Sequence, residues 1–112
     1  MIKNQLIYVA HPFGGDKANK YSIDTIMENL VMLDKNNTYL SPLHNFSMLY
    51  FNTQYSKGLK ICLDMLNKCD ALVLCGEWET SKGCIGEWSF AIAKGMPIYT
   101  WKEWTDKLKE QG

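Results

Sequence analysis

The stretch LIYVAHPFGGD at residues 6–16 joins an apolar run to a turn, and the fold follows from it. Branched and aromatic side chains dominate the run, so we expect a strand over Ile2–Ala10 that is buried on both faces. The turn after it, from His11 to Asp16, contains two glycines and leads into an amphipathic helix. A buried strand that passes directly into a helix is typical of an α/β domain.

Strands and helices alternate along the rest of the chain. Apolar residues at Ile23, Ile26, Met27, Leu30 and Val31 recur at helical spacing, and Asp16 or Ser22 is the expected N-cap. Further strands are expected at Thr38–Ser41, Ala71–Cys75 and Pro97–Trp101, with loops at Pro42–Tyr55 and Gly76–Lys82. Leu59, Cys62, Leu63 and Leu66 mark a second helix. The stripe Ile85, Trp88, Ala91 and Ile92 marks a third helix, which Gly95 closes, and a short helix is expected around Trp104 and Leu108. Such an alternation predicts a parallel sheet with helices on both faces, in one domain spanning residues 1–112.

The composition is that of one globular domain. The chain has 112 residues, of which 46% are hydrophobic, and twelve lysines balance twelve acidic residues. Without a charge excess we expect no nucleic-acid partner and no binding to a membrane surface. The longest apolar run, Ala71–Cys75, is too short to span a bilayer, and Met1–Ala10 lacks a signal-peptide pattern, so we expect a cytoplasmic protein.

The four cysteines match neither a zinc site nor a CxxC redox motif in their spacing. Cys62 and Cys69 are two helical turns apart, Cys75 ends an apolar run, and Cys84 follows nine residues later. This arrangement favours buried structural thiols. We therefore expect neither a metal nor a cofactor.

Ligands of open parallel sheets bind beyond the carboxyl ends of the strands, which selects two loops here. The first loop, His11–Asp16, places Gly14 and Gly15 between a strand and a helix, where backbone N–H groups and the helix dipole can receive a phosphate. The sequence is neither the dinucleotide fingerprint nor a P-loop, so a plain tight turn is the alternative interpretation.

The second loop brings Ser81, Gly83, Gly86 and Glu87 to the start of a helix. An acidic side chain there gains from the positive end of the helix dipole. We therefore expect the pKa of Glu87 to be lowered, which would keep the carboxylate ionised as a nucleophile or an electrostatic stabiliser. A solvated glutamate in the first turns is the alternative.

Four other residues are candidates for the site or have purely structural roles. His11 follows the first strand and either hydrogen-bonds a substrate or is satisfied by backbone groups, whereas His44 is expected at the surface. Tyr8 belongs to the core, where its hydroxyl needs a partner such as a carboxylate. Trp78 lies in a loop at a strand end, where it can pack or stack on a base.

Three segments of the chain resemble the nucleoside 2-deoxyribosyltransferase superfamily. They are IYVAHPF at 7–13, CDALVL at 69–74 and SKGCIGE at 81–87, and the likeness spans about residues 2–100. It is greatest to a small bacterial and phage branch of the DUF4406 type, in which a stretch similar to GEWETSKG at 76–83 recurs.

The resemblance implies a flavodoxin-like Rossmann sandwich of three layers, with about four parallel strands in the order 2-1-3-4, assembled as a homodimer or larger homo-oligomer. It also implies cleavage of the N-glycosidic bond of deoxynucleosides or of their 5′-monophosphates. The glutamate that matches Glu87 attacks the anomeric carbon, and the tyrosine that matches Tyr8 orients it; a close carboxylate stabilises the oxocarbenium character that develops on the sugar. The substrate-binding residues that we expect are His11, Phe13, Gly14, Gly15, Trp78, Ser81, Lys82 and Gly83.

Position 81 favours a phosphorylated substrate. The nucleoside transferases resemble this motif but have an aspartate there, which holds a free 5′-hydroxyl. Nucleotide N-hydrolases have a serine six residues before the glutamate, which is the spacing from Ser81 to Glu87. A hydroxyl beside helix N–H groups suits a phosphate, and Lys82 adds positive charge.

Three departures from the superfamily bear on the reaction. Active members carry a second acid that serves the leaving base, and this chain has Cys62 there; Asp64 lies about 200° further around a helix and would normally point elsewhere. Pro12 stands where nucleotide hydrolases can have a hydroxyl residue. The chain also stops before the C-terminal segment that transferases lend to a neighbour's site, which argues against transfer.

The leading prediction is an enzyme that hydrolyses the base–sugar bond of a (deoxy)nucleoside 5′-monophosphate through Glu87. One alternative is a nucleoside 2-deoxyribosyltransferase. A second, suggested by Cys62, is a catalytically inactive module that binds or sequesters a nucleotide or nucleoside. A third is a domain whose aromatic loop meets a protein partner.

Overall fold

The computed structural model describes residues 4–13, 17–44 and 55–111, and it contains one sheet. Its strands are β1 (Leu6–Ala10), β2 (Thr38–Leu40), β3 (Ala71–Leu74) and β4 (Ile98–Thr100). Its helices are α1 (Lys17–Leu33), α3 (Tyr55–Asn67), the short 3-10 helix η1 (Trp78–Thr80), α4 (Lys82–Lys94) and α5 (Trp101–Gln111). The strands pair in parallel in the order β2-β1-β3-β4, so the predicted topology is confirmed.

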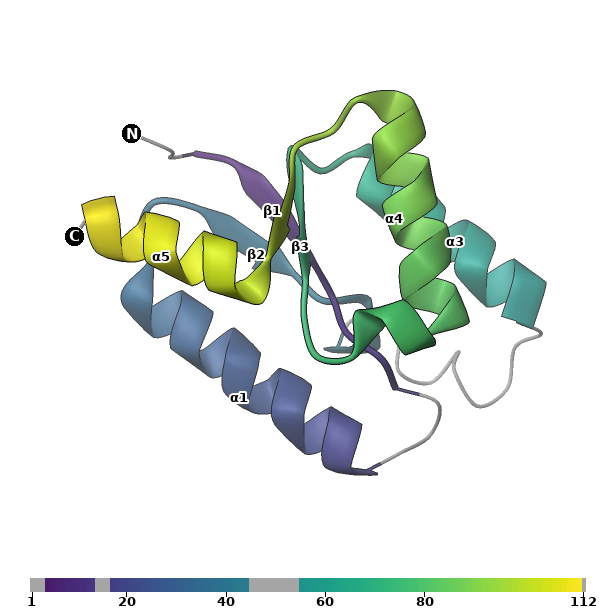
Figure 1. The fold of residues 1–112 in the computed structure, drawn as a ribbon, viewed down its shortest axis with the longest axis horizontal. Coiled ribbons are helices and arrows are strands. Elements are labelled where there is room, and N and C mark those ends of the chain that lie inside the picture. Colours follow the sequence, from purple (N-terminus) through teal and green to yellow (C-terminus); the bar gives the residue numbers. More distant parts are fainter. Residues whose placement is uncertain (1–3, 14–16, 45–54, 112) are drawn as a thin grey trace.

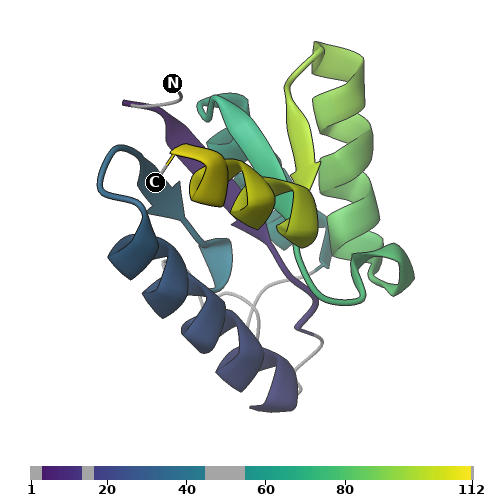
Figure 2. The same cartoon turned by 60° about the vertical axis from the view of Figure 1, so that its left-hand side comes forward.

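The helices cover both faces of the sheet. Figures 1 and 2 show α1 and α5 on one face and α3 and α4 on the other. Side chains alternate along β1, because successive residues of a strand point to opposite faces. Ile7 and Val9 pack on the side of α1 and α5, whereas Tyr8 and Ala10 pack with the residues of α3 and α4. All four are at most 1% exposed, which confirms a strand buried on both faces.

The order of the strands changes direction between β1 and β3, which is the switch point of the sheet. From β1 the chain crosses to β2 on one side, and β3 lies on the other side, hydrogen-bonded to β1 from Ile7↔Ala71 to Ala10↔Leu74. The carboxyl ends of β1 and β3 and the first turn of α4 lie at the same edge of the molecule (Figure 1). This is the edge where open parallel sheets bind ligands.

The last strand is shorter than the sequence pattern predicted. We expected a strand over Pro97–Trp101, but it ends at Thr100 and α5 begins at Trp101. The reason is a capping box: Thr100 N–H donates to Glu103 Oε1 at 2.8 Å, and Glu103 N–H donates to Thr100 Oγ1 at 3.2 Å. The T-x-x-E spacing in the sequence was the available signal for this boundary.

The buried stripes of two helices are placed differently from the prediction. Val31 of α1 is 62% exposed, because it lies roughly 80° around the helix from Ile23, at the edge of the apolar face. On α4 the buried residues are Cys84, Glu87 and Ala91, and Ile92 is 52% exposed. Helix α4 is therefore rotated so that a glutamate faces the interior.

Smaller corrections concern caps and loops. Ser22 lies inside α1, which starts at Lys17, so it is not the N-cap, and Asp16 is outside the described residues. Residues 42–44, expected in a loop, form a helical turn, and the rest of that loop up to residue 54 is outside the described ranges. Cys69, Cys75 and Cys84 are buried free thiols and Cys62 is half-buried. No helix in the described ranges is long and apolar enough to cross a membrane.

Candidate active site

A buried contact between Tyr8 and Glu87 forms the centre of the site. The Tyr8 hydroxyl, from the middle of β1, donates a hydrogen bond to Glu87 Oε2 on α4 across 79 residues of sequence. Tyr8 is fully buried, and Glu87 is 6% exposed. The two residues that the superfamily resemblance singled out as nucleophile and orienter are thus in direct contact.

The position of Glu87 on α4 explains its burial. Cys84, Glu87 and Ala91 follow one another at i, i+3 and i+7, so they share the face that packs on the sheet. The small side chains of Cys84 and Ala91 let the helix approach closely. Gly86 lies beside Leu59 of α3, where a Cβ would be in ordinary contact at 3.4 Å. Burial of the face of α4 that packs on the sheet leaves Glu87 6% exposed and so removes water from its carboxylate.

The expected pKa of Glu87 was wrong in direction. Burial raises the pKa of Glu87 from 4.5 to about 7, and the hydrogen bond from Tyr8 acts in the opposite direction without cancelling it. Ser81 caps the helix, so Glu87 lies in its second turn, beyond the turn over which the helix dipole acts strongly. At neutral pH the carboxyl group is poised between its two protonation states.

A small recess opens beside this carboxyl at the end of β1. Its cavity volume is about 20 Å³, room for about one water molecule, and it opens to solvent. The residues that line the recess are Val9, Ala10, His11, Ile23, Ser41, Pro42, Leu43 and Glu87. They come from β1, α1, the end of β2 and α4, so the recess lies at the switch point of the sheet.

His11 lines the recess and is held by two partners. Its Nδ1 lies 2.7 Å from Pro12 O, and because a carbonyl only accepts, this nitrogen donates; Nε2 lies 3.0 Å from Ser22 Oγ. Gly76 makes room for the ring, since a Cβ there would be 2.9 Å from His11 Nε2. Both partners belong to the protein, which agrees with the alternative of a satisfied turn histidine.

Ser81, Lys82 and Gly83 form the first turn of α4. Ser81 is the N-cap, and its hydroxyl oxygen accepts a hydrogen bond from Cys84 N–H at 3.3 Å. Because this oxygen accepts, its O–H can donate to a ligand oxygen at a helix end that attracts anions. Lys82 is exposed beside it. These three residues lie at the same edge of the sheet as the recess but do not line it.

The remaining predicted binding residues lie in different surroundings. Trp78 is half-buried in η1 and packs against Trp88, with ring centroids 5.9 Å apart, so one of its faces is taken by protein. Phe13 packs against the core cluster on the α1 and α5 side. Gly14 and Gly15, the expected phosphate cradle, lie outside the described residues.

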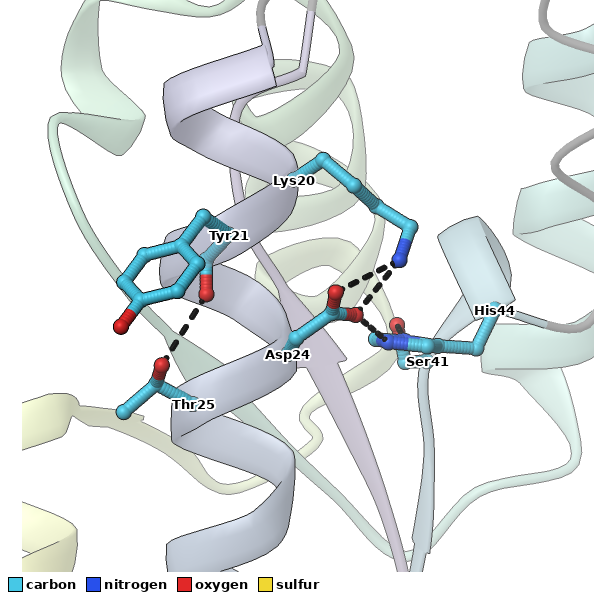
Figure 3. A network of polar contacts seen from close by, with 6 residues as sticks. All are labelled: Lys20, Tyr21, Asp24, Thr25, Ser41 and His44. Carbon is cyan, nitrogen blue, oxygen red and sulfur yellow. Dashed lines mark hydrogen bonds and ion pairs between the residues drawn. The ribbon is translucent and has the colours of Figure 1, made fainter.

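The sequence analysis missed a polar network at the end of β2 and placed His44 at the surface without a role. Figure 3 shows His44 between two partners: its Nδ1 lies 2.8 Å from Ser41 Oγ, and its Nε2 contacts Asp24 Oδ1. Lys20 binds both oxygens of Asp24 at 2.6 and 2.7 Å. The available signal was that Ser41 and His44 follow the carboxyl end of β2, a strand next to β1. Ligand sites use the strand ends near a switch point.

Helix α3 supplies no carboxylate to this site from the two positions considered. Cys62, at the position of the second acid, is half-buried and carries a thiol in place of a carboxylate. Burial raises the pKa of the Cys84 thiol on α4 to about 12. Asp64 is 64% exposed and pairs with Lys60 at 2.8 Å, so it does not replace the acid. Across residues 4–13, 17–44 and 55–111, no cluster of three His, Cys, Asp or Glu side chains is suited to a metal ion.

Comparisons with known proteins identify relatives of this fold. The model of a family described as a domain of unknown function, DUF4406, matches residues 5–100. Comparison with curated protein sequences gave no match.

Solved structures of other proteins share the fold. A 2-desoxiribosyltransferase from Leishmania mexicana has a TM-score of 0.62 at 24% identity, over 86% of this chain and 63% of its own. A conserved protein from Enterococcus faecalis V583 has a TM-score of 0.68 at 23% identity, over 86% and 62%. A 2-deoxyribosyltransferase from Bacillus psychrosaccharolyticus has a TM-score of 0.64 at 19% identity, over 85% and 70%. The chain thus spans less than two thirds of the first two structures.

Proposed function

The chain belongs to the DUF4406 family, and from this premise we propose that it hydrolyses the base–sugar bond of a nucleoside 5′-monophosphate with Glu87 as the nucleophile. The observation that carries the proposal is the buried Tyr8–Glu87 pair beside a recess at the sheet's switch point. A carboxyl group that is buried, hydrogen-bonded and shifted in pKa in a recess is the usual mark of a catalytic acid or nucleophile.

In the proposed reaction, a Glu87 oxygen bonds to the anomeric carbon while the bond from that carbon to the base nitrogen breaks. Water then cleaves the glycosyl ester and restores the carboxylate. Tyr8 holds Glu87 Oε2, which leaves Oε1 for the sugar. Because the attacking form is the anion and burial raises the pKa to about 7, the reaction should need the ionised fraction of Glu87.

The phosphate preference is supported by the start of α4. A monophosphate favours a helix end with N–H donors, a hydroxyl and a nearby ammonium, which Ser81 and Lys82 supply. Ser81 in place of an acid avoids repulsion of the phosphate. We infer that the phosphate binds there, with the sugar towards Glu87.

The test is incubation with ribo- and deoxynucleoside 5′-monophosphates and with the free nucleosides, followed by chromatography of the released base. Wild type should release base from a monophosphate, and Glu87→Ala should lose roughly a thousandfold or more of that rate. Glu79→Ala removes an exposed glutamate of η1 and is the matched control, with unchanged activity expected. The absence of release by wild type from every compound would refute the proposal.

The pH dependence sharpens the same test. Below the pKa of Glu87, about 7, the value of kcat/KM should rise about tenfold per pH unit as the carboxyl group ionises. Tyr8→Phe removes the hydrogen bond that lowers this pKa, so the rising limb should move to higher pH. A limb that does not move would show that Tyr8 does not act on Glu87.

The same assay distinguishes two alternative functions. The 2-deoxyribosyltransferases that share the fold favour transfer, which a second free base in the mixture would reveal as a new nucleoside or nucleotide. Cys62 on α3 favours a module that only binds or sequesters its ligand. Calorimetry with micromolar or tighter binding and no turnover would identify that case.

A further inference from the structure

The proposed hydrolysis needs a proton for the departing base, and the structure assigns that proton to His44, which delivers it through the hydroxyl of Ser41. This inference rests on the proposed function and adds the acid that α3 does not provide. It concerns the wall of the recess across from α4, formed where β2 ends.

Ser41 is the member of this network that reaches the recess. It lines the same recess as Glu87 and is 1% exposed, so bulk water does not compete for its hydroxyl. Its carbonyl accepts the N–H of His44 at 3.1 Å, which fixes the helical turn between the two residues. The backbone thus holds the imidazole against the hydroxyl.

His44 stands between the recess and a carboxylate. Its Nδ1 is 2.8 Å from Ser41 Oγ, and its Nε2 contacts Asp24 of α1 (Figure 3). When both ring nitrogens carry protons, one donates to Ser41 and the other to Asp24. Asp24 accepts from Nε2 and so orients the ring towards Ser41, as the carboxylate does in other Asp–His–Ser arrangements.

Lys20 completes the network by holding Asp24 in its charged form. It reaches both carboxylate oxygens, and its hydrogen bonds, with a smaller contribution from His44, lower the pKa of Asp24. The side chains of Lys20, Asp24 and His44 are 30–41% exposed, so His44 can recover a proton from solvent after each turnover. Ser41, in contrast, remains inside.

One proton moves from His44 through Ser41 to the base as the base departs. As the bond from the anomeric carbon to the base nitrogen breaks, its electron pair goes to the base, which takes the hydroxyl proton of Ser41. Ser41 Oγ takes the proton of His44 Nδ1 in the same step, and His44 becomes neutral. Glu87 forms the new bond to carbon, so no other reactant is required.

The experiment compares two leaving groups. Natural bases of nucleotides depart with a proton, whereas 4-nitrophenolate departs without one. We would measure base release from the four 2′-deoxynucleoside 5′-monophosphates and nitrophenolate release from 4-nitrophenyl 2-deoxyribofuranoside 5-phosphate. His44→Gln and Ser41→Ala should lower kcat for the nucleotides by about a hundredfold or more, and leave the nitrophenyl rate within about threefold of wild type.

Controls separate the relay from a structural effect. Asp106→Asn removes another exposed ion pair of the same spacing, Lys102–Asp106 at 2.7 Å on α5, and should change neither rate. Ser41→Thr keeps a hydroxyl and should restore part of the nucleotide rate. The nitrophenyl rate also shows that each variant is folded.

Three outcomes would overturn the relay. Equal losses on both substrates would show that His44 and Ser41 only shape the recess, and unchanged nucleotide rates would show that the proton comes from elsewhere. A wild type that cleaves the nitrophenyl compound but no nucleotide would refute the proposed nucleotide hydrolysis and the relay with it, and would leave Glu87 as a nucleophile towards activated leaving groups only. Failure of wild type on both substrates would refute the Glu87 chemistry as well.

Discussion

Glu87 holds its proton more tightly in the folded chain than in the unfolded one. Burial raises its pKa to about 7, whereas an unfolded glutamate stays near its ordinary value of 4.5. Between those values the folded state binds more protons, so the free energy of unfolding falls as pH rises through this window and is level above it. The difference in pKa corresponds to about 3 kcal/mol.

Glu87→Gln should therefore stabilise the protein at alkaline pH. Glutamine keeps an oxygen for the Tyr8 hydroxyl and carries no charge. Urea unfolding should show similar stabilities of variant and wild type near pH 5 and an advantage for the variant of up to about 3 kcal/mol at pH 8. The exposed Glu79→Gln should show no such dependence on pH, and an equal response of both variants would contradict the burial argument.

Sequence reasoning found the members of the Tyr8–Glu87 pair but not their electrostatics. A glutamate near a helix start predicts a lowered pKa when only the helix is considered. The raised pKa depends on the depth at which α4 packs on the sheet, through the buried face that Cys84 and Ala91 share with Glu87. His44 and Ser41 were missed because their partners, Asp24 and the recess, come together only in three dimensions.

Turns and helix ends show where single residues decide an element. Two described glycines have positive φ angles: Gly76, after β3, at +63°, and Gly95, at the end of α4, at +77°. A Cβ at Gly76 would lie 2.9 Å from His11 Nε2, whereas a Cβ at Gly95 would meet nothing within 4 Å. The same substitution thus has different consequences in the two turns.

Gly76→Ala should cost more stability than Gly95→Ala. The left-handed backbone alone costs an alanine about 1 kcal/mol, which is the effect expected at Gly95. At Gly76 the ring of His11 must also move away from Ser22 and Pro12 O, so we expect about 2–3 kcal/mol in thermal or urea unfolding. Equal losses of stability in the two variants would show that the His11 ring moves aside at no cost in free energy.

The elements themselves were largely predictable, and their ends were not. Short apolar runs identified β1 and β3, and the glycine at the end of α4 was recognised as its terminator. The end of β4 was misplaced by one residue because the Thr100–Glu103 capping box outweighs the strand preference of Trp101. Local side-chain bonds of this kind override periodicity at boundaries.

At the scale of the whole molecule, the resemblance predicts a homodimer or larger assembly. The last turn of α1 carries three consecutive exposed apolar residues, Val31, Met32 and Leu33, which are 62%, 76% and 68% exposed. Large apolar side chains that are exposed together in one turn of a helix can form part of an interaction site. We propose this turn as part of the contact between copies.

Light scattering after size-exclusion chromatography tests the assembly. Wild type should elute with a mass of at least twice the monomer's 12.9 kDa, and Met32→Glu should shift the population towards monomer. Ile92→Glu changes an exposed residue of α4 and is the matched control, with no shift expected. A monomeric wild type at all concentrations would contradict the prediction.

The central position of β1 in the sheet has a consequence for how the chain folds. The N–H of Gln5, just before β1, donates to Asn37 Oδ1 across 32 residues, and the N–H of Leu6 donates to Asp70 Oδ2 across 64. The hydroxyl of Tyr8 reaches Glu87 across 79 residues. Contacts this distant in sequence form late, because the intervening chain must first be ordered. During synthesis β1 can pair with β2 early, but its other edge stays open until β3 has emerged, and the Tyr8–Glu87 contact forms only after α4 has followed.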